Sequence, residues 1–442
     1  MKVMIVGNGG REYALAWKLE QSREVSSILC VPGNGATESL ASCRNIPLPV
    51  SEKGEDLERI SVLARDEQVD LAVIGPELPL IGGLADLLRG AGVSTFGPGA
   101  EGARLEGSKV EAKEFMRRHG VRTAESKRFV HTQREEVHRY LDEVDYPRVI
   151  KADGPAAGKG VFICSDRAEA QEVLDQLFVR QSLGASGSQV LIEEYLQGRE
   201  VSVLVLCDGK RSLPLVSAMD HKRVGEGDAG PNTGGMGVIA PNPYFTAEYR
   251  DDFKRSILDP TVEGLRREGI DFRGTLFLGL MLTAGRSYLL EYNVRFGDPE
   301  TQAILPLLEE GLAPLLMQVS RGELEPRPLN YREGFACNVV AAAVGYPGEY
   351  QKGLPVVIGE MTENAQVFPA GVARREGELV SSGGRVLSVT GMGGSLTEAR
   401  RRAYQAMEGV RFESIYYRRD IGLREAEKEV GGDNNSKSRS LF

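Results

Sequence analysis

The chain has 442 residues, of which 41% are hydrophobic and 26% charged, a composition typical of a globular protein with about two to four domains. Its 54 basic and 63 acidic residues leave a net charge of −9, which argues against nucleic acid as a partner. The five cysteines are scattered without a C-x-x-C pair, so we expect neither disulfides nor a zinc site. The N-terminus reads as a strand rather than a signal peptide, and no apolar run could span a membrane. We therefore expect a cytoplasmic protein.

The first hundred residues alternate between apolar strands and helical stretches. Strands are predicted at residues 2–6, 27–31 and 71–74, and a helix at 12–21. This alternation indicates βαβ units in a doubly wound parallel sheet. Ligands of such sheets bind at the carboxyl ends of the strands.

A second, α+β unit begins near Leu105, with an amphipathic helix at residues 109–119 and several strands. A mixed third unit follows a charged, proline-containing linker. We expect domains at 1–103, 104–325 (with a mobile lobe at about 122–190) and 326–424. The polar residues 425–442 are expected to be disordered, because they lack the apolar side chains that offset ordering entropy.

The first glycine run, GNGGRE, follows a strand and opens a helix. Free N–H groups and the helix dipole favour an anion there, so Gly9 and Gly10 are candidate phosphate-binding residues. A dinucleotide fingerprint fits less well, because Glu12 takes the third glycine position and no acid closes the second strand. A purely structural turn remains an alternative.

Glu77 follows the strand at residues 71–74 and looks across the same sheet edge. A carboxylate there suits recognition of sugar hydroxyls, and a solvent-facing turn residue is the alternative.

The second glycine run, KADGPAAGKG, lies between two strands at residues 151–160. It is one residue short of a P-loop and lacks the Ser or Thr that would hold magnesium. A small-residue hairpin with Lys151 and Lys159 suits a lid over nucleotide phosphates, because glycine permits close approach and the amines offset charge. A plain hairpin turn is the alternative.

A strand at residues 191–193 runs into a possible hinge near Tyr195, with Glu200 beyond it. Such a hinge can present backbone groups to adenine and a carboxylate to ribose. By itself this signal is weak, because acids often follow apolar strands.

The run DHKR at residues 220–223 precedes a Gly-, Asn- and Thr-rich loop at 230–237. Three cations beside such a loop predict an anionic substrate. Candidate substrate contacts are Lys222, Arg223, Asn232, Thr233 and Gly234. Asp220 and His221 are candidate catalytic residues, and a structural role for His221 stays equally open.

The run LEYNVRFGDPET places Glu291 and Asn293 two residues apart on a strand, so both face one side. Two oxygen donors at this spacing suit magnesium, which completes its octahedron with water and phosphate. Arg295 follows and can neutralise a transferring phosphoryl group. A surface pair is the alternative. Asp298 and Thr301, in the turn beyond, are further candidate substrate contacts.

In their order, these motifs resemble the ATP-grasp superfamily and, within it, the phosphoribosylamine–glycine ligase family. The resemblance spans nearly the whole chain. It rests on the runs above together with LEGSK (105–109), GLMLT (279–283), GYPG (345–348), GGRVL (383–387) and DIG (420–422).

The resemblance implies an N-terminal doubly wound domain, two ATP-grasp lobes and a C-terminal domain. It implies that Arg295 and Lys151 act in catalysis, and that Glu291 and Asn293 bind Mg²⁺ or Mn²⁺. Gly9, Gly10, Glu12 and Glu77 would bind 5-phosphoribosylamine. The implied ATP contacts are Lys109, Lys151, Gly154, Gly158, Lys159, Gly160, Glu193, Tyr195, Leu196 and Glu200.

The implied reaction is ATP-dependent ligation of glycine to 5-phosphoribosylamine through glycyl phosphate, in a monomer or weak homodimer. Another ATP-grasp carboxylase or ligase of purine or biotin metabolism is the nearest alternative, and a nicotinamide-dependent dehydrogenase a remoter one. The chain departs from the family at Tyr13, where histidine is usual, and at Pro155, where leucine is commoner. The strand at 274–283 also lacks the acid that many ATP-grasp enzymes use as a metal ligand.

Overall fold

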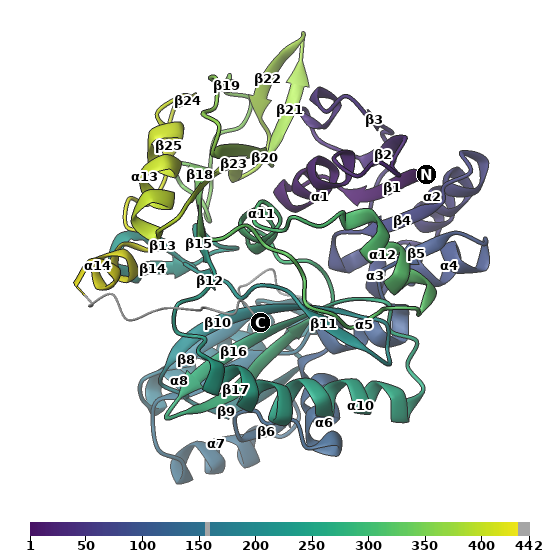
Figure 1. Ribbon diagram of the computed structural model, residues 1–442. Helices are drawn as coiled ribbons and strands as arrows, with labels where there is room; N and C mark the ends of the chain where they lie inside the picture. Colours follow the sequence, from purple (N-terminus) through teal and green to yellow (C-terminus); the bar gives the residue numbers. More distant parts are fainter. Residues whose placement is uncertain (155–159, 432–442) are drawn as a thin grey trace.

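The N-terminal unit is a five-stranded parallel sheet of order β3-β2-β1-β4-β5 in the computed structural model, which describes residues 1–154 and 160–431 (Figure 1). Alternate residues of the central strand enter two different cores: Val3 and Ile5 pack with one, Met4 and Val6 with the other. Both faces are therefore covered, as the predicted doubly wound fold requires. The elements are β1 (Lys2–Gly7), α1 (Gly10–Glu20), β2 (Ser27–Pro32), β3 (Cys43–Asn45), α2 (Gly54–Asp66), β4 (Leu71–Ile74), α3 (Glu77–Ile81), α4 (Leu84–Gly90) and β5 (Ser94–Phe96).

The first central lobe has an antiparallel sheet of order β6-β9-β7-β8 with two helices against it. Its core, which includes Phe129, Ile150 and Ile192, is separate from the two larger cores of the molecule. The elements are β6 (Ser126–Val130), α7 (Arg134–Glu143), β7 (Arg148–Ala152), β8 (Val161–Cys164), α8 (Arg167–Leu174) and β9 (Gln189–Glu194).

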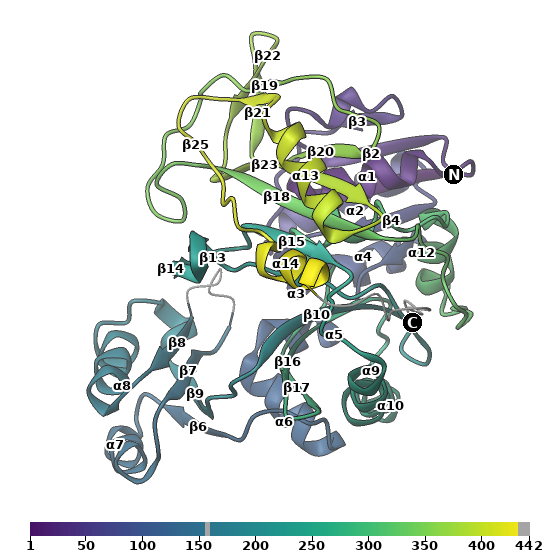
Figure 2. The ribbon, with the colours of Figure 1, turned by 60° about the vertical axis from the view of Figure 1, so that its left-hand side comes forward.

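The second central lobe has an antiparallel sheet of order β11-β10-β16-β17. Helix α6 lies against one face of this sheet, where its Phe115 meets Tyr292 of β17 with ring centroids 6.2 Å apart. Figure 2 shows this sheet and the first lobe diverging below the rest of the chain. The elements are α5 (Ala100–Gly107), α6 (Lys109–His119), β10 (Arg199–Cys207), β11 (Ser212–Pro214), α9 (Ala247–Phe253), α10 (Asp259–Glu268), β16 (Gly274–Thr283), β17 (Arg286–Asn293), α11 (Glu300–Ile304) and α12 (Leu312–Arg321).

The C-terminal unit has a sheet of order β12-β15-β18-β23-β20, with β25 also paired to β18. Its first two strands come from the central region, so the segment after Ala218 is built into the C-terminal sheet. The elements are β12 (Met219–Asp220), β13 (Arg223–Gly225), β14 (Ala229–Asn232), β15 (Gly237–Ala240), β18 (Phe335–Ala343), β19 (Val357–Ile358), β20 (Ala365–Pro369), β21 (Val372–Arg375), β22 (Glu378–Ser381), β23 (Arg385–Gly393), α13 (Leu396–Met407), β24 (Val410–Arg411), β25 (Ile415–Tyr416) and α14 (Leu423–Gly431).

Helix α1 joins the N-terminal and C-terminal units, and both ribbon views place it beside β20 (Figures 1 and 2). The ring centroid of Phe368 lies 5.5 Å from that of Trp17 and 6.5 Å from that of Tyr13, both in edge-on geometry. Such pairs stabilise an interface beyond their buried area. Tyr13, the departure from the family pattern, therefore belongs to this packing.

The prediction that the chain is disordered from Glu425 onward is wrong for residues 425–431, which lie in α14. Ala426 is buried, and the Tyr244 hydroxyl donates to the Glu425 carboxylate at 3.0 Å. Helix α14 is ordered by packing against residues far away in the sequence, such as Tyr244, and the local composition does not reveal this packing. Residues 432–442 lie outside the described part of the chain. Among the described residues, no helix is long and apolar enough to cross a membrane.

The packing of α13 on β23 yields a stability prediction. A Cβ at Gly391 would overlap the backbone of Ala399 and Ala403 in α13. We expect Gly391→Ala to push the helix from the sheet at a cost on the order of 1–3 kcal/mol, as for other overpacked cores. A lower midpoint of thermal unfolding would record this cost.

Gly90→Ala is the matched control, because a Cβ there meets nothing within 4 Å. Its midpoint should stay close to that of the parent protein. Equal midpoints for both variants would contradict the predicted overlap.

Candidate active site

A cleft of about 1520 Å³ opens between the two central lobes and continues to the C-terminal unit. Strands β7 and β8 form one wall, the hinge after β9 closes the back, and β16 and β17 form the floor. Residues at the ends of β12 and β13 reach it from the C-terminal sheet. Residues lining the cleft include Lys151, Tyr195, Glu200, Lys222, Leu290 and Glu291.

Two buried lysines share one carboxylate at the cleft's edge. Glu193, which is 2% exposed, lies 3.0 Å from the amine of Lys151 and 3.2 Å from that of Lys113. Lys151 also donates to the Leu290 carbonyl at 2.9 Å, so it spans from the first lobe to the floor. Burial lowers the pKa of Lys113 to about 8, although Glu193 opposes the shift. The Glu193 side chain thus orients two buried lysines.

The start of α6 is pinned to the beginning of the glycine-rich hairpin. Lys109 donates to the Gly154 carbonyl at 2.9 Å, and Asp153 accepts from the N–H of Val110 at 3.1 Å. Burial lowers the pKa of Lys109. Gly160 closes the hairpin by accepting from the N–H of Ala152 at 2.8 Å. The predicted phosphate contacts Gly158 and Lys159 lie outside the described residues.

The hinge after β9 carries Tyr195 and Leu196, both of which line the cleft. Beyond it, Glu200 forms a 2.7 Å ion pair with Lys222. Glu200 is the largest influence on Lys222 and raises the pKa of its amine against burial, with help from Glu291 and Asp220. Lys222 is therefore held charged at the junction of the hinge, the floor and the C-terminal sheet.

The strand with Glu291 and Asn293 is β17, as predicted, but its register contains a bulge. Glu291 pairs with Gly279 while Leu289 pairs with Leu280, so Leu290 is the extra residue. Glu291 lines the cleft, whereas Tyr292 is buried on the opposite face. Burial raises the pKa of Glu291, but Lys222, Lys151 and Lys109 outweigh it and hold that pKa below its usual value. The carboxylate stays ionised in a ring of cations.

Arg295 lies between two acids, 3.1 Å from Glu77 and 3.0 Å from Glu106. Burial lowers its pKa, but Glu106 and Glu77 more than compensate, so the pKa of Arg295 is raised. Glu77 projects from the strand end of the N-terminal sheet, as predicted. Arg295 thus links that sheet edge to the floor of the cleft.

The first glycine loop is filled by the Glu12 side chain. The N–H of Gly9 donates to the Glu12 carboxylate at 2.6 Å, and the carboxylate also pairs with Arg11 at 2.6 Å. A Cβ at Gly75 or Gly7 would collide with it, so the glycines are required for its close approach. Glu12 is 3% exposed and shapes the loop from within.

Asp298 lies where all three units meet. It accepts from Gln302 at 2.8 Å and lies 3.4 Å from the Arg385 guanidinium of β23. A Cβ at Gly9 would come 3.2 Å from its carboxylate, and one at Gly10 would touch Gln302. The structure therefore brings Gly9, Gly10 and Asp298 together.

The predicted substrate contact at Thr301 is wrong. Thr301 is fully buried and its hydroxyl donates to the Gly297 carbonyl at 2.6 Å, inside the turn that starts α11. Local sequence cannot tell a residue that supports such a turn from one that faces a ligand.

The loop from Asp220 to Gly237 is organised mainly by its own contacts and those of the C-terminal unit. Thr233 donates to the Lys222 carbonyl at 2.8 Å, and Arg223 pairs with Asn232 across β13 and β14. Gly234 donates to the Tyr346 hydroxyl at 3.1 Å, and its carbonyl accepts from Arg385.

Asp220 carries the carboxyl at the start of this loop. Its Oδ1 is buried and unpartnered among the described residues. Burial and the neighbouring Glu300 carboxyl raise the pKa of Asp220 well above its usual range.

His221 fits the structural interpretation better than the catalytic one. Its Nδ1 lies 3.2 Å from the Gly237 carbonyl, and its Nε2 accepts from the N–H of Gly422 at 3.0 Å. Both ring nitrogens are thus used by the backbone. Burial and the nearby Arg418 lower its pKa, which keeps the imidazole neutral.

Several residues of the site were not identified from the sequence. Glu106, Arg385 and Asp420 stand inside quoted motifs (LEGSK, GGRVL and DIG) without an assigned role. Lys113 carried a usable signal, because it lies one turn after Lys109 on the buried face of α6. A lysine on a buried helical face needs a partner, and that partner is Glu193.

The arrangement defines a class of enzyme. A nucleotide-sized cleft between two α+β lobes, with a glycine-rich hairpin, three lysines and a carboxylate strand, is the ATP-grasp fold. Proteins of this fold use ATP.

Comparison with known proteins identifies the family. Three models of phosphoribosylglycinamide synthetase match the chain: the N domain at residues 1–106, the ATP-grasp (A) domain at 107–301 and the C domain at 336–424. The phosphoribosylamine–glycine ligase of Clostridium acetobutylicum is 45% identical over 96% of this chain and 99% of its own. That of Nostoc sp. is 46% identical with the same coverage. The chain belongs to the phosphoribosylglycinamide synthetase family. Its members are ATP-dependent ligases that join glycine to phosphoribosylamine in purine biosynthesis.

Solved structures agree. A phosphoribosylamine–glycine ligase from Thermotoga maritima superposes with a TM-score of 0.83 at 38% identity, covering 95% of this chain and 100% of that one. The biotin carboxylase domain of a Hydrogenobacter thermophilus 2-oxoglutarate carboxylase gives a TM-score of 0.72 at 18% identity, covering 96% and 92%. At that identity the second likeness concerns the fold alone, and the carboxylase alternative is not favoured.

The shifted titration of Lys113 yields a pH prediction. Its pKa is about 8 in the folded protein and 10.5 as the ordinary value, so the unfolded chain binds more protons between these pH values. Stability from this group therefore rises with pH across that window. We expect the parent protein to gain stability relative to Lys113→Met between pH 8 and pH 10, measured as midpoints of denaturant unfolding.

Lys210→Met, at an exposed position, is the control. The difference in unfolding midpoint between Lys210→Met and the parent should stay constant between pH 8 and pH 10. If the difference in unfolding midpoint between the parent and Lys113→Met does not change with pH, the lowered pKa of the buried Lys113 is contradicted.

Proposed function

We propose that this chain joins glycine to 5-phosphoribosylamine at the expense of ATP, giving phosphoribosylglycinamide, ADP and phosphate. The observation that carries the proposal is the convergence of Lys109, Lys151 and Lys222 around Glu291 in one cleft. Three amines around one carboxylate suit a metal-bound polyphosphate. We place the enzyme in the cytoplasm, as a monomer or weak homodimer.

ATP lies with its adenine at the hinge of Tyr195 and Leu196 and its ribose beside Glu200. The polyphosphate extends towards Lys109 and Lys151, beside Gly154, whose carbonyl accepts from Lys109. Glu200 already holds Lys222 through an ion pair at 2.7 Å, so a ribose hydroxyl shares this carboxylate with the lysine. The hairpin's small residues allow close approach to phosphate.

A magnesium or manganese ion fits Glu291 and Asn293. The Glu291 carboxylate is held ionised by its lysine neighbours, as a metal ligand requires. The described residues contain no cluster of three or more His, Cys, Asp or Glu side chains suited to a metal. A few protein oxygens are what Mg²⁺ uses when phosphates and water complete its shell. When bound, the ion neutralises charge on the β- and γ-phosphates.

The acceptor lies at the carboxyl edge of the N-terminal sheet. Gly10 lies at the start of α1, where the N–H groups of the first helical turn suit the 5-phosphate, while the N–H of the adjoining Gly9 donates to Glu12. Glu77 faces the ribose hydroxyls and is held by Arg295 at 3.1 Å. Asp298, beside Gly9, completes this side of the site. Arg223, Asn232, Thr233 and Gly234 approach from the C-terminal sheet, whereas Lys222 faces the polyphosphate of ATP beside Glu200 and Glu291.

The reaction has two displacements. The glycine carboxylate attacks the γ-phosphorus of ATP, forming glycyl phosphate and releasing ADP. The amine of phosphoribosylamine then attacks the acyl carbon, phosphate leaves, and the nitrogen loses a proton. Catalysis is mainly positioning and charge neutralisation, the task of Lys151 and Arg295. Asp220, with its unpartnered oxygen and raised pKa, is suited to exchange the amine proton.

The nicotinamide alternative has little support. Its fingerprint requires an open glycine loop for a pyrophosphate, and here Glu12 occupies that loop. It also leaves the lysine cluster and the hairpin without a task.

Product formation tests the reaction directly. With ATP and magnesium, phosphate release should require glycine and phosphoribosylamine together, and the product should contain one new amide. Mass spectrometry and a phosphate assay measure this. Release driven by bicarbonate, or reduction of a nicotinamide, would sink the proposal.

The metal assignment has its own test. We expect Glu291→Ala to lower kcat at least 10²-fold, because the metal loses its charged ligand. The surface variant Glu263→Ala on α10 is the control and should keep parental activity. Near-normal turnover of Glu291→Ala, across a magnesium titration, would refute the assignment.

A further inference from the structure

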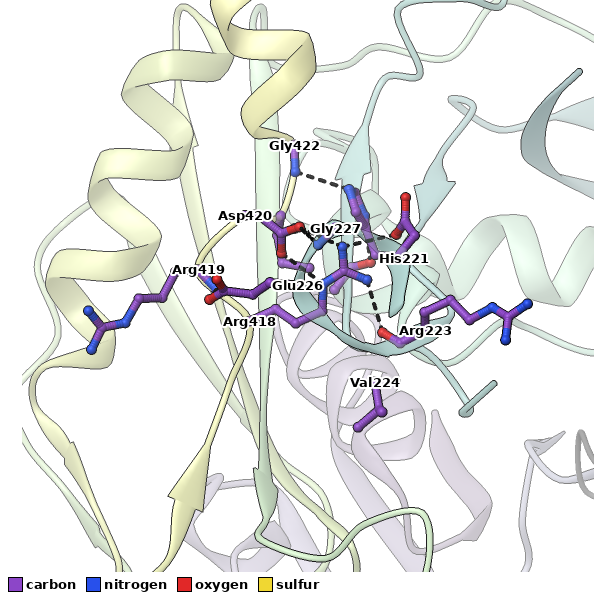
Figure 3. A network of polar contacts seen from close by, with 12 residues as sticks. His221, Arg223, Val224, Glu226, Gly227, Arg418, Arg419, Asp420 and Gly422 are labelled. Carbon is purple, nitrogen blue, oxygen red and sulfur yellow. Dashed lines mark hydrogen bonds and ion pairs between the residues drawn. The ribbon is translucent and has the colours of Figure 1, made fainter. Parts of the chain in front are cut away.

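A network of polar contacts fastens one segment of the C-terminal unit to the loop that follows β12 (Figure 3). The segment spans residues 416–422, between β25 and α14, and the loop spans residues 221–228. At its centre is Arg418, whose side chain is 1% exposed and among the largest fully buried ones. A fully buried arginine is costly unless its donors are satisfied, so its contacts show what it holds.

Arg418 uses all three of its nitrogens. Its Nε and Nη2 donate to the two carboxylate oxygens of Asp420, each at 2.8 Å, in a bidentate pair. Nη2 also donates to Asp228 at 3.0 Å, and Nη1 donates to the carbonyl of Arg223 at 2.9 Å. One guanidinium thereby fixes both ends of the segment 223–228.

Other contacts hold the same loop between those ends. The N–H of Gly227 donates to Asp420 at 2.8 Å, and the Tyr416 hydroxyl donates to the Val224 carbonyl at 2.8 Å. The N–H of Arg419 donates to the Glu226 carboxylate at 3.0 Å. The exposed Arg419 side chain points away from the network in Figure 3.

The loop needs such support because its backbone is unusual. Gly227 has φ of +66° and Asp228 has φ of +59°, both in the left-handed region. For Asp228, which has a side chain, this conformation is unfavourable in isolation and persists when surrounding contacts determine it. The contact from Arg418 to Asp228 is such a determinant.

The ion pair stays charged over a wide pH range. Burial raises the pKa of Asp420, but Arg418 and the N–H of Gly227 outweigh it and lower that pKa to about 2. The pKa of Arg418 is raised by Asp420 and Asp228 despite burial. The ion pair between Arg418 and Asp420 is therefore charged on both sides at physiological pH.

The loop that Arg418 holds includes Lys222, which lines the cleft. Arg223, whose carbonyl Arg418 holds, is the next residue along the chain. Lys222 pairs with Glu200 at 2.7 Å and lowers the pKa of Glu291. A shift of the Arg223 carbonyl would move the Lys222 amine relative to both carboxylates.

We propose that Arg418 is a positioning residue for nucleotide binding: through the Arg223 carbonyl and Asp228 it fixes where Lys222 meets the polyphosphate of a nucleoside triphosphate. The inference rests on the proposed function only in taking ATP as the nucleotide. It makes the C-terminal unit part of the nucleotide site, although Arg418 itself need not touch the nucleotide.

The test is a double-mutant cycle on nucleotide affinity. Calorimetry measures the Kd of a non-hydrolysable ATP analogue with magnesium for the parent, Arg418→Met, Lys222→Met and the double variant. We expect Arg418→Met to weaken binding about 5-fold or more, and to add less than about 2-fold in the Lys222→Met background, as coupled residues do. KM for ATP should rise while kcat changes less.

Arg419→Met is the matched control. It removes the same charge from the neighbouring residue, but only the main-chain N–H of Arg419 enters the network, so affinity should stay within about 2-fold of the parent. If Arg418→Met does not fold, Asp228→Ala replaces it in the cycle. That residue is half exposed, and its removal leaves the Arg418–Asp420 pair intact.

Folded Arg418→Met or Asp228→Ala protein with parental affinity would overturn the proposal. So would fully additive losses, because Arg418 would then act otherwise than through Lys222. Binding of the analogue needs neither glycine nor phosphoribosylamine. Failure of the ligation assay with an intact coupling would therefore refute the proposed function and leave this inference standing.

Discussion

The structure depends on keeping several lysines charged inside a cleft before any nucleotide arrives. Buried cations of like sign repel and lose hydration, so each needs a carboxylate partner. Glu193 holds Lys151 and Lys113, and Glu200 holds Lys222. Removing either glutamate would leave a lysine of the cleft without its carboxylate partner. Glu193 and Glu200 therefore compensate the charge of the lysines in the absence of any substrate.

This constraint explains how the units are joined. Glu193 lies in the last strand of the first lobe, Lys113 belongs to a helix of the second, and Lys151 reaches across to the Leu290 carbonyl. These polar contacts cross between the two lobes, and the first lobe has a hydrophobic core of its own. The same pattern recurs above the cleft, where Arg295 links two acids and Arg385 links three segments. Ion pairs therefore link the units around the cleft.

Much of the fold followed from local patterns. Short apolar runs located β4, β7 and β8, and the amphipathic pattern located α6, because these signals depend on neighbouring residues alone. The carboxylate strand was found for the same reason, since alternation sends Glu291 and Asn293 to one face. The bulge at Leu290 was not found, because it is set by the register with β16. Helix α14 was missed because the surface that orders it comes from Tyr244 and neighbouring segments.

The sequence alone determined the family, the order of motifs and the main candidates for the nucleotide and metal sites. Residue type and spacing carry that information directly. Only the tertiary structure decided which polar side chains face the cleft and which support it. It assigned Thr301 and His221 to internal hydrogen bonds, brought Lys113 into the lysine cluster, and tied the Lys222 loop to Arg418 nearly two hundred residues later. A side chain's partner across the fold is a long-range property, which local composition and spacing do not encode.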